Sequence, residues 1–116
     1  MRHGRKYRKL NRPTDQRLQM LTDIAVALFT YDKIKTTVTR AKEVRRLAAW
    51  FVFWARENKV AAKRRLQAYV KDRSKVKMIC EKSLQRFEGR KSGFTRMVRV
   101  GMRRGDGVPM ARLELV

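Results

Sequence analysis

The chain has 116 residues, and its 31 Lys and Arg residues against 10 Asp and Glu residues give a formal net charge of +21. Ten acids cannot neutralise 31 bases, so ion pairs within the chain cannot balance its surface charge. This excess indicates a polyanionic partner such as a nucleic acid. Hydrophobic residues make up 43% of the chain, which excludes a wholly disordered protein, and the single cysteine, Cys80, excludes an internal disulfide framework.

The first segment, residues 1–13, is predicted to form an extended basic arm, because it shows no helical or strand periodicity. Three roles remain open for it: a targeting peptide, a solubilising tail, or an arm that orders against a polyanion. A secretory signal is disfavoured, since no apolar segment follows the basic start. The candidate nucleic-acid contacts of the arm are Arg2, His3, Arg5, Lys6, Arg8, Lys9 and Arg12.

The remainder, residues 14–116, is predicted to form one globular domain. Its first helix is expected to begin at Thr14, which can cap, and at Asp15, which suits the positive end of the helix dipole. Apolar residues at helical spacing continue this helix to about Thr30.

A strand and three helices are predicted next. Residues 33–38 alternate and are rich in β-branched side chains, which is typical of a strand. Thr39 is expected to cap a helix over residues 39–58, whose apolar residues recur every three or four positions. The same spacing predicts helices over residues 60–71 and 74–88.

The last part of the chain alternates again, which predicts strands over residues 94–102 and 110–116. Turn-forming residues join them, and their Asp-Gly pair is typical of a hairpin. The result is an α+β domain with the order α-β-α-α-α-β-β, whose helices pack on one face of a small mixed sheet behind the extended basic N-terminal arm.

No constellation typical of catalysis is evident. The one histidine, His3, is far in sequence from Cys80, which disfavours a Cys–His nucleophile pair. The sequence contains neither zinc-site spacing nor a Gly-rich phosphate loop. Cys80 is interpreted as a buried residue of a helix stripe. We therefore expect no enzymatic activity, no metal or other cofactor and no small-molecule substrate.

Basic residues outside the arm gather in patches between apolar segments. Each phosphate contact releases counterions, so many such contacts give strong, salt-dependent affinity. Patches on several faces fit a folded RNA better than one groove of DNA, and no helix-turn-helix, zinc finger or basic zipper is evident. These candidate contacts are Arg40, Lys42, Arg45, Arg46, Lys63, Arg64, Arg65, Arg90, Lys91, Arg96, Arg99, Arg103 and Arg104.

Three motifs occur in order along the chain. They are MRHG at 1–4 with KLNR at 9–12, IKTT at 34–37 with RAKE at 40–43, and GFTR at 93–96 with RRGD at 103–106, PMA at 109–111 and ELV at 114–116. With these motifs the chain resembles the bacterial-type large-ribosomal-subunit protein 17 family over essentially its full length.

This resemblance implies a structural, non-catalytic constituent of the large ribosomal subunit that binds large-subunit rRNA near the polypeptide exit side. Neighbouring large-subunit proteins are implied as partners, and neither a membrane nor a second copy of the chain is expected. The competing hypothesis is a free-standing architectural protein that binds DNA. Carried over by position, the implied rRNA contacts lie on the arm and on Thr37, Thr39, Lys42, Arg45, Arg96, Arg103 and Arg104.

Two stretches depart from the usual pattern of that family. Residues 12–17, RPTDQR, are similar to its cyanobacterial and plastid versions, which predicts the chloroplast stroma, with a cyanobacterial cytoplasm as the alternative. Residues 50–54, WFVFW, are unusually aromatic, and Trp50 and Phe53 fall outside the apolar stripe of their helix. Three fates are open for these two side chains: core packing, the usual one, contact with a protein partner, or stacking on a base.

Overall fold

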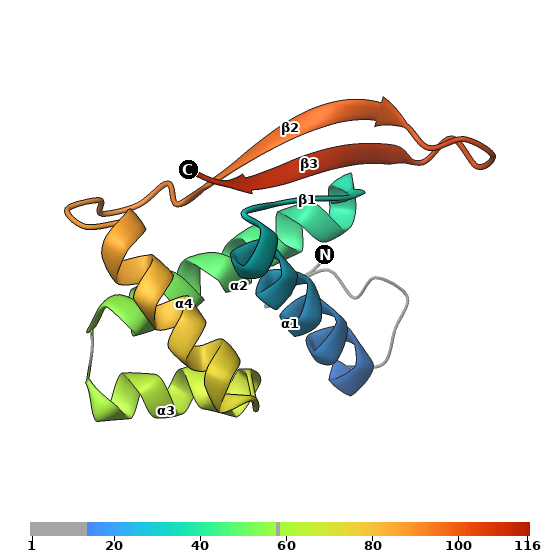
Figure 1. The fold of residues 1–116 in the computed structure, drawn as a ribbon. Helices are drawn as coiled ribbons and strands as arrows, with labels where there is room; N and C mark the ends of the chain where they lie inside the picture. Colours follow the sequence, from blue (N-terminus) through green and yellow to red (C-terminus); the bar gives the residue numbers. More distant parts are fainter. Residues whose placement is uncertain (1–13, 58) are drawn as a thin grey trace, which may run out of the picture.

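A computed structural model describes residues 14–57 and 59–116, which fold into four helices and three strands (Figure 1). The predicted α+β class and order of elements are confirmed, whereas the arm lies outside the described residues. The elements are α1 Thr14–Tyr31, β1 Lys33–Thr37, α2 Val38–Glu57, α3 Val60–Tyr69, α4 Arg73–Arg86, β2 Thr95–Met102 and β3 Pro109–Leu115.

The three strands form one sheet in the order β1-β3-β2. β3 pairs antiparallel with both neighbours, so the sheet is antiparallel throughout and the prediction of a mixed sheet was wrong. β1 and β2 run in the same direction, but β3 returns from the hairpin between them and no parallel pair forms. A bulge between Arg99 and Gly101 shifts the β2–β3 register, and Gly101, with a φ of 107°, adopts a backbone conformation that favours glycine.

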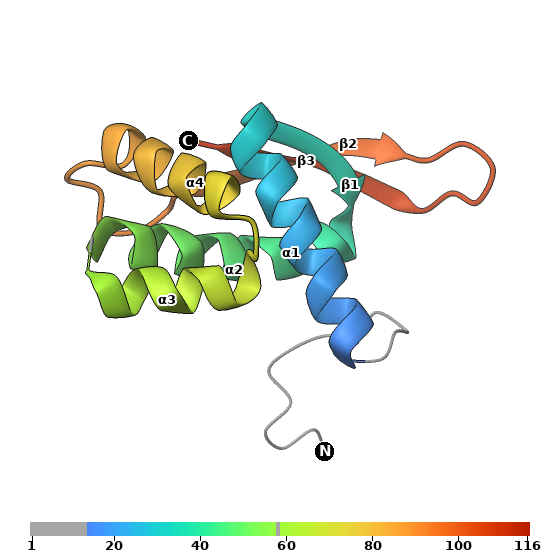
Figure 2. The ribbon, with the colours of Figure 1, turned by 60° about the horizontal axis from the view of Figure 1, so that its bottom comes forward.

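The helices cover one face of the sheet, and within residues 14–57 and 59–116 nothing covers the other (Figures 1 and 2). The strand period of two decides which side chains meet the helices. Ile34 and its partner Leu113 lie on the covered face and pack in the core. Lys33 and Arg96 both lie opposite Glu114, so these three residues lie together on the open face.

One main core lies between the helices and the covered face of the sheet. Each fully buried large apolar side chain stabilises the fold by about 1.5–3 kcal/mol. Within the described residues, this core draws on all four helices and on the covered face of the sheet. The largest fully buried apolar side chains are Phe29, Phe51, Phe87, Leu28, Leu66, Ile79 and Leu113.

Helix α2 begins at Val38, one residue earlier than predicted. Thr39 lies inside the helix and is not its cap, so that prediction was wrong. The backbone N–H of Arg40 instead donates to Oγ1 of Thr37 at 3.4 Å, which places the capping side chain at the last residue of β1. Threonine suits both roles, because its β-branched side chain is favoured in strands and its hydroxyl oxygen can accept the capping hydrogen bond.

A polar clamp joins α1, α4 and the end of β3. Lys82 Nζ donates to Asp32 Oδ1 at 2.9 Å and to the carbonyl oxygen of Phe29, while Arg86 donates to the carbonyl oxygen of Leu115 at 3.1 Å. The hydrogen bond from Lys82 is the main cause that holds the pKa of Asp32 below its ordinary value. These two cations therefore stabilise the fold.

Candidate nucleic-acid interface

The arm carries seven of the predicted nucleic-acid contacts and lies outside the described residues. Those seven contacts therefore stay predictions. The other candidates lie on four parts of the surface: the first half of α2, helix α3, the loop between α4 and β2, and the sheet with its hairpin.

The outer side of α2 changes character along its length. Thr39, Lys42 and Arg46 follow one another at spacings of three and four residues, and Trp50 and Phe53 continue the same line. All five are exposed except Lys42, which is half-buried. The first half of this stripe is thus polar and basic, and the second half is aromatic.

Two further predicted contacts lie beside this stripe. Arg45 is exposed on α2. Thr37 is half-buried, and its hydroxyl accepts the capping bond from the backbone of Arg40, which leaves the hydroxyl proton for another acceptor. Both residues can therefore still contact a phosphate.

Helix α3 carries Lys63, Arg64 and Arg65, and all three are exposed. Successive residues of an α-helix point in different directions, so these cations spread over the outer side of α3. Arg65 borders the space between α2 and α3.

The loop between α4 and β2 holds two predicted contacts, Arg90 and Lys91, and both are exposed. The guanidinium of Arg90 donates to the carbonyl oxygen of Gly93 at 3.0 Å, and Arg56 donates to the carbonyl oxygen of Arg90. Arg90 thus braces its own loop.

The hairpin arginines have different surroundings. Arg103 pairs with Asp106 across the turn at 2.5 Å, and its hydrogen bond lowers the pKa of that carboxyl to about 2. Arg104 is exposed. Arg99 is exposed and lies opposite Ala111, which packs against the beginning of α2.

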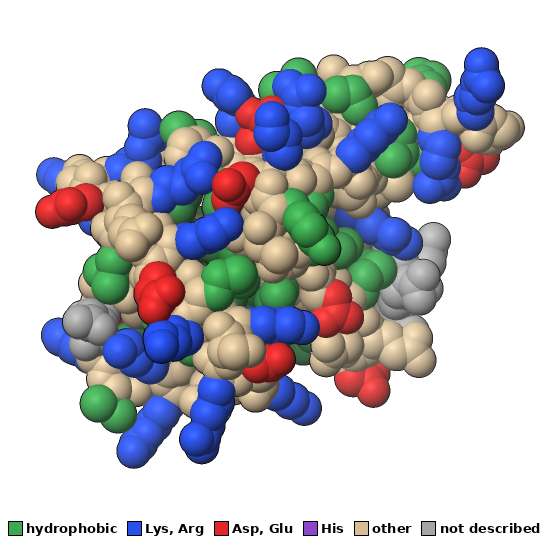
Figure 3. Space-filling model, viewed as in Figure 1, with side chains coloured by type: hydrophobic (Ala, Val, Ile, Leu, Met, Phe, Trp, Pro, Cys, Tyr) green, Lys and Arg blue, Asp and Glu red, His purple; other side chains and the backbone are tan. Residues whose placement is uncertain are grey.

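The open face of the sheet is cationic. Arg96 pairs with Glu114 at 2.6 Å, and Arg112 pairs with the same carboxylate from its own strand. The hydrogen bond from Arg96, assisted by that from Arg112, holds the pKa of Glu114 below its ordinary value. Lys33 and Lys35 lie on this same face in β1 and are exposed, and in Figure 3 blue side chains gather over the strands around an acidic one.

Trp50 and Phe53 do not pack in the core. Each side chain is 51% exposed, so the expectation of core packing was wrong for both. Their helix turns Phe51, Val52 and Trp54 inward instead. Contact with a protein and stacking on a base remain as the two alternatives for the exposed pair.

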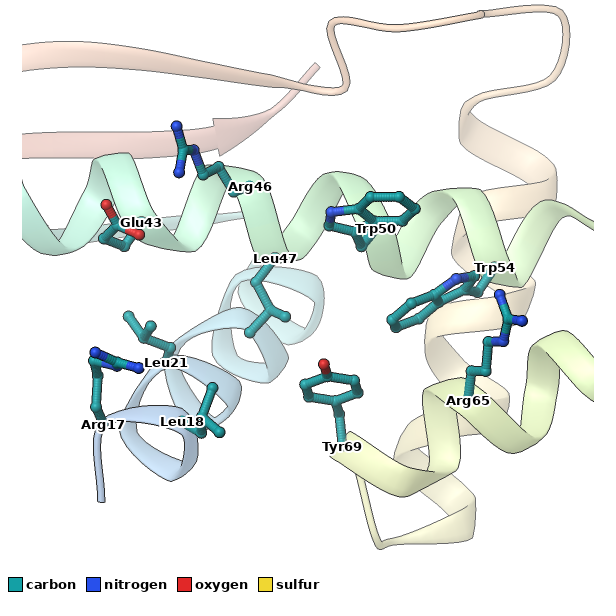
Figure 4. A pocket seen from close by; sticks show the side chains of 10 residues that line it. All are labelled: Arg17, Leu18, Leu21, Glu43, Arg46, Leu47, Trp50, Trp54, Arg65 and Tyr69. Atoms are coloured by element: carbon teal, nitrogen blue, oxygen red, sulfur yellow. The ribbon is translucent and has the colours of Figure 1, made fainter. Parts of the chain in front are cut away.

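A groove of about 450 Å³ lies between α1, α2 and α3 (Figure 4). Trp54 and Tyr69 stack on each other at 5.6 Å on one side of it, and Trp50 lies 5.8 Å from Trp54 between their ring centres. Leucine side chains of α1 form the opposite wall. The lining residues are Arg17, Leu18, Leu21, Glu43, Arg46, Leu47, Trp50, Trp54, Arg65 and Tyr69.

Groups suited to catalysis or metal binding are few. Within residues 14–57 and 59–116, no cluster of three or more His, Cys, Asp or Glu side chains could hold a metal ion. Cys80 is buried, and burial raises the pKa of its thiol, which disfavours the reactive thiolate. Among the described helices, none has the length and apolar character needed to cross a bilayer.

Comparison with known proteins identifies the family of this chain. A sequence profile described as ribosomal protein L17 matches residues 20–116. The chain belongs to this ribosomal protein L17 family. Relatives named large ribosomal subunit protein bL17 include one from Dictyoglomus thermophilum, which is 40% identical over the full length of both chains.

Two other relatives with the same name agree with this identification. The protein from Caldanaerobacter subterraneus subsp. tengcongensis is 42% identical over 95% of this chain and 98% of its own length. The protein from Clostridium perfringens strain SM101 is 43% identical over 95% of this chain and 97% of its own length. The resemblance seen in the three sequence motifs is therefore confirmed.

The contacts predicted from the sequence did not include all of the cationic surface. Lys33, Lys35 and Arg112 were not among the predicted contacts, although the structure places them with Arg96 on the open face of the sheet. Lys33 and Lys35 are two residues apart in a predicted strand, and this spacing already placed them on one face. Among the groove residues, the sequence singled out Arg46, Arg65 and Trp50, but it could not bring them together because they come from different helices.

Proposed function

We propose that this chain is a structural constituent of the large ribosomal subunit and binds large-subunit rRNA. The observation that carries this proposal is a packed core with cationic surfaces on α2, α3, the α4–β2 loop and the open face of the sheet. The relatives named above support it, since each is a large ribosomal subunit protein. Membership of the ribosomal protein L17 family also favours a structural, non-enzymatic role.

The RNA contacts that we propose include the predicted residues of the arm, of α2, of α3 and of the hairpin. To these we add the open face of the sheet, whose two lysines and two arginines stand against one acid, Glu114. Charges of this kind contact phosphate groups without reading base sequence. The chain would therefore recognise the backbone of a folded RNA chiefly by shape and charge.

A free-standing architectural DNA-binding protein is the rival function. Proteins of that class present one helix or ribbon to one groove of a duplex. Here the basic residues are distributed over two helices, a loop and a sheet, which favours RNA that surrounds the protein on several sides. The proposed site near the polypeptide exit side follows from the family resemblance.

Neighbouring large-subunit proteins are proposed as further partners, with Phe53 as one contact, since exposed aromatic side chains are enriched at interfaces. The proposed location is the chloroplast stroma, on the evidence of residues 12–17, with a cyanobacterial cytoplasm as the alternative. The presence of the chain in large subunits from purified chloroplasts would support the stromal location. Its presence only in bacterial large subunits would contradict it.

Cosedimentation tests the function directly. Ribosomes from cells that express the chain are separated into subunits, and the large subunits are washed in high salt. We expect the chain to stay with the large subunit, because many simultaneous phosphate contacts retain it. Release of the chain into the wash, with recovery on DNA, would favour the architectural role.

A further inference from the structure

We propose that the groove between α1, α2 and α3 binds one unpaired nucleotide of RNA, with its base in the groove and its phosphates on the arginines. This inference rests on the proposed function, because it takes RNA as the ligand and assigns one element of that RNA to the groove.

The shape of the groove suits a planar ring. Trp50 on α2 and Tyr69 on α3 present aromatic surface, and Leu18 and Leu21 on α1 present aliphatic surface across the groove from them (Figure 4). Trp50 is 51% exposed, so its ring surface is available to a ligand. A base between such walls stacks on an aromatic side chain, which every base can do because every base has a π-face.

The charges at the ends of the groove suit a nucleotide within a strand. Arg17 on α1 and Arg65 on α3 lie at opposite ends in Figure 4, and Arg46 lies on α2. A nucleotide in a chain has one phosphate on each side of its sugar. Two guanidinium groups on opposite sides of a base slot match that arrangement, because guanidinium binds phosphate bidentately.

The same charges favour RNA over a protein segment. Three arginines and one carboxylate, Glu43, line the groove, which gives a formal charge of +2. Glu43 is only 3% exposed, whereas Arg46 and Arg65 are exposed. A basic protein segment would be repelled there, and an acidic apolar peptide is the protein ligand that remains as an alternative outcome.

Intrinsic fluorescence gives a local readout, because Trp50 and Trp54 are the two tryptophans of the chain and both line the groove. The full chain is titrated with a single-stranded oligoribonucleotide of mixed sequence and with a fully paired RNA duplex of the same length. We expect saturable quenching by the single strand and little quenching by the duplex, whose bases cannot enter.

Trp50→Ala is expected to weaken single-strand binding roughly 5- to 150-fold at a salt concentration that suppresses charge contacts, as the loss of one base stack predicts. Trp50→Phe keeps an aromatic ring and should lose less. Phe53→Ala is the matched control: Phe53 has the same exposure on the same helix and lies outside the groove, where its ring meets that of Trp50 edge-to-face at 5.9 Å between centres. Circular dichroism confirms that each variant folds.

Equal affinity of Trp50→Ala and Phe53→Ala for the single strand would overturn the inference, as would quenching by an acidic apolar peptide but not by RNA. RNA binding seen by anisotropy without any change in tryptophan fluorescence would also overturn it and leave the proposed function intact. Absence of RNA binding by either readout would contradict the proposed function itself.

Discussion

The open face of the sheet and the groove between the helices are two surfaces of one small protein with opposite chemistry. The open face of the antiparallel sheet carries lysines and arginines, and one carboxylate, Glu114, lies among them. The groove is hollow and aromatic, with arginines only along its rim. The open face can attract the phosphate backbone of RNA of any sequence, whereas the groove can hold a single base.

The two surfaces should differ in how their affinity for RNA depends on salt. Affinity that comes from phosphate contacts falls steeply with salt, because each contact releases condensed counterions. Affinity that comes from stacking depends much less on salt, because no ion is released when a base meets a ring. A variant of one surface should therefore change a property that a variant of the other surface leaves alone.

The largest expected effect comes from Phe51→Ala, which removes a fully buried ring behind the groove. Phe51 lies 6.3 Å from Trp54 and 6.0 Å from Tyr69 between ring centres, so its loss leaves a cavity behind the aromatic wall. We expect a loss of about 3–5 kcal/mol in the free energy of unfolding, measured by urea denaturation. A loss below about 1 kcal/mol would contradict the proposed role of Phe51 in supporting the groove.

The double variant Lys33→Ala and Lys35→Ala separates the two surfaces. We expect the slope of log affinity for RNA against log salt to become shallower by about 1.4–1.8, because two phosphate contacts are lost. Quenching of tryptophan by the single strand at high salt should stay unchanged. An unchanged salt slope would show that these lysines are only solvated side chains.

Glu114→Gln tests the charge balance of the open face. Removing the negative charge leaves Arg96 and Arg112 without their shared partner, so we expect a lower Tm together with higher RNA affinity at low salt. Because the folded-state pKa of Glu114 lies below the ordinary 4.5, its stabilising effect is present above that pH and is lost as the pH falls through the folded value.

The difference in Tm between wild type and Glu114→Gln should therefore be full at neutral pH and should shrink as the pH falls below about 4.5. Thermal melts across this pH range measure it. A Tm difference that stays constant down to strongly acidic pH would show that the ion pairs do not cause the effect.

The smallest expected effect comes from Asp106→Asn at the hairpin turn. This change removes the ion pair with Arg103 and weakens the bond from the backbone N–H of Val108, which is 3.3 Å from Asp106 Oδ1. We expect faster amide hydrogen exchange at the turn, little change in Tm, and unaltered fluorescence quenching in the groove. Unchanged exchange at Val108 would show that the turn keeps its conformation without the carboxylate.

Local sequence signals predicted the elements because each element has its own periodicity. The alternation at Lys33 to Val38 and the stripe from Val44 to Ala55 follow from backbone geometry alone. The cap of α2 was assigned to Thr39 and lies at Thr37, since both residues are threonines near a strand-to-helix boundary. Choosing between them requires the exact end of the strand pairing.

Features that depend on distant parts of the chain were harder to predict. The antiparallel order of the sheet follows from β3 entering between β1 and β2, which no short segment specifies. Trp50 was expected in the core because large aromatic side chains are usually buried, yet the core behind its helix is already filled by Phe51 and Trp54. The groove exists only because α1, α2 and α3 meet around it.

A density map of the large subunit that contains this chain would show both surfaces in contact with their partners. We expect RNA backbone in contact with Lys33, Lys35 and Arg112 on the open face of the sheet, and one unstacked base against Trp50 in the groove. Solvent over the open face and a protein segment in the groove, or a large subunit from which the chain is absent, would contradict it.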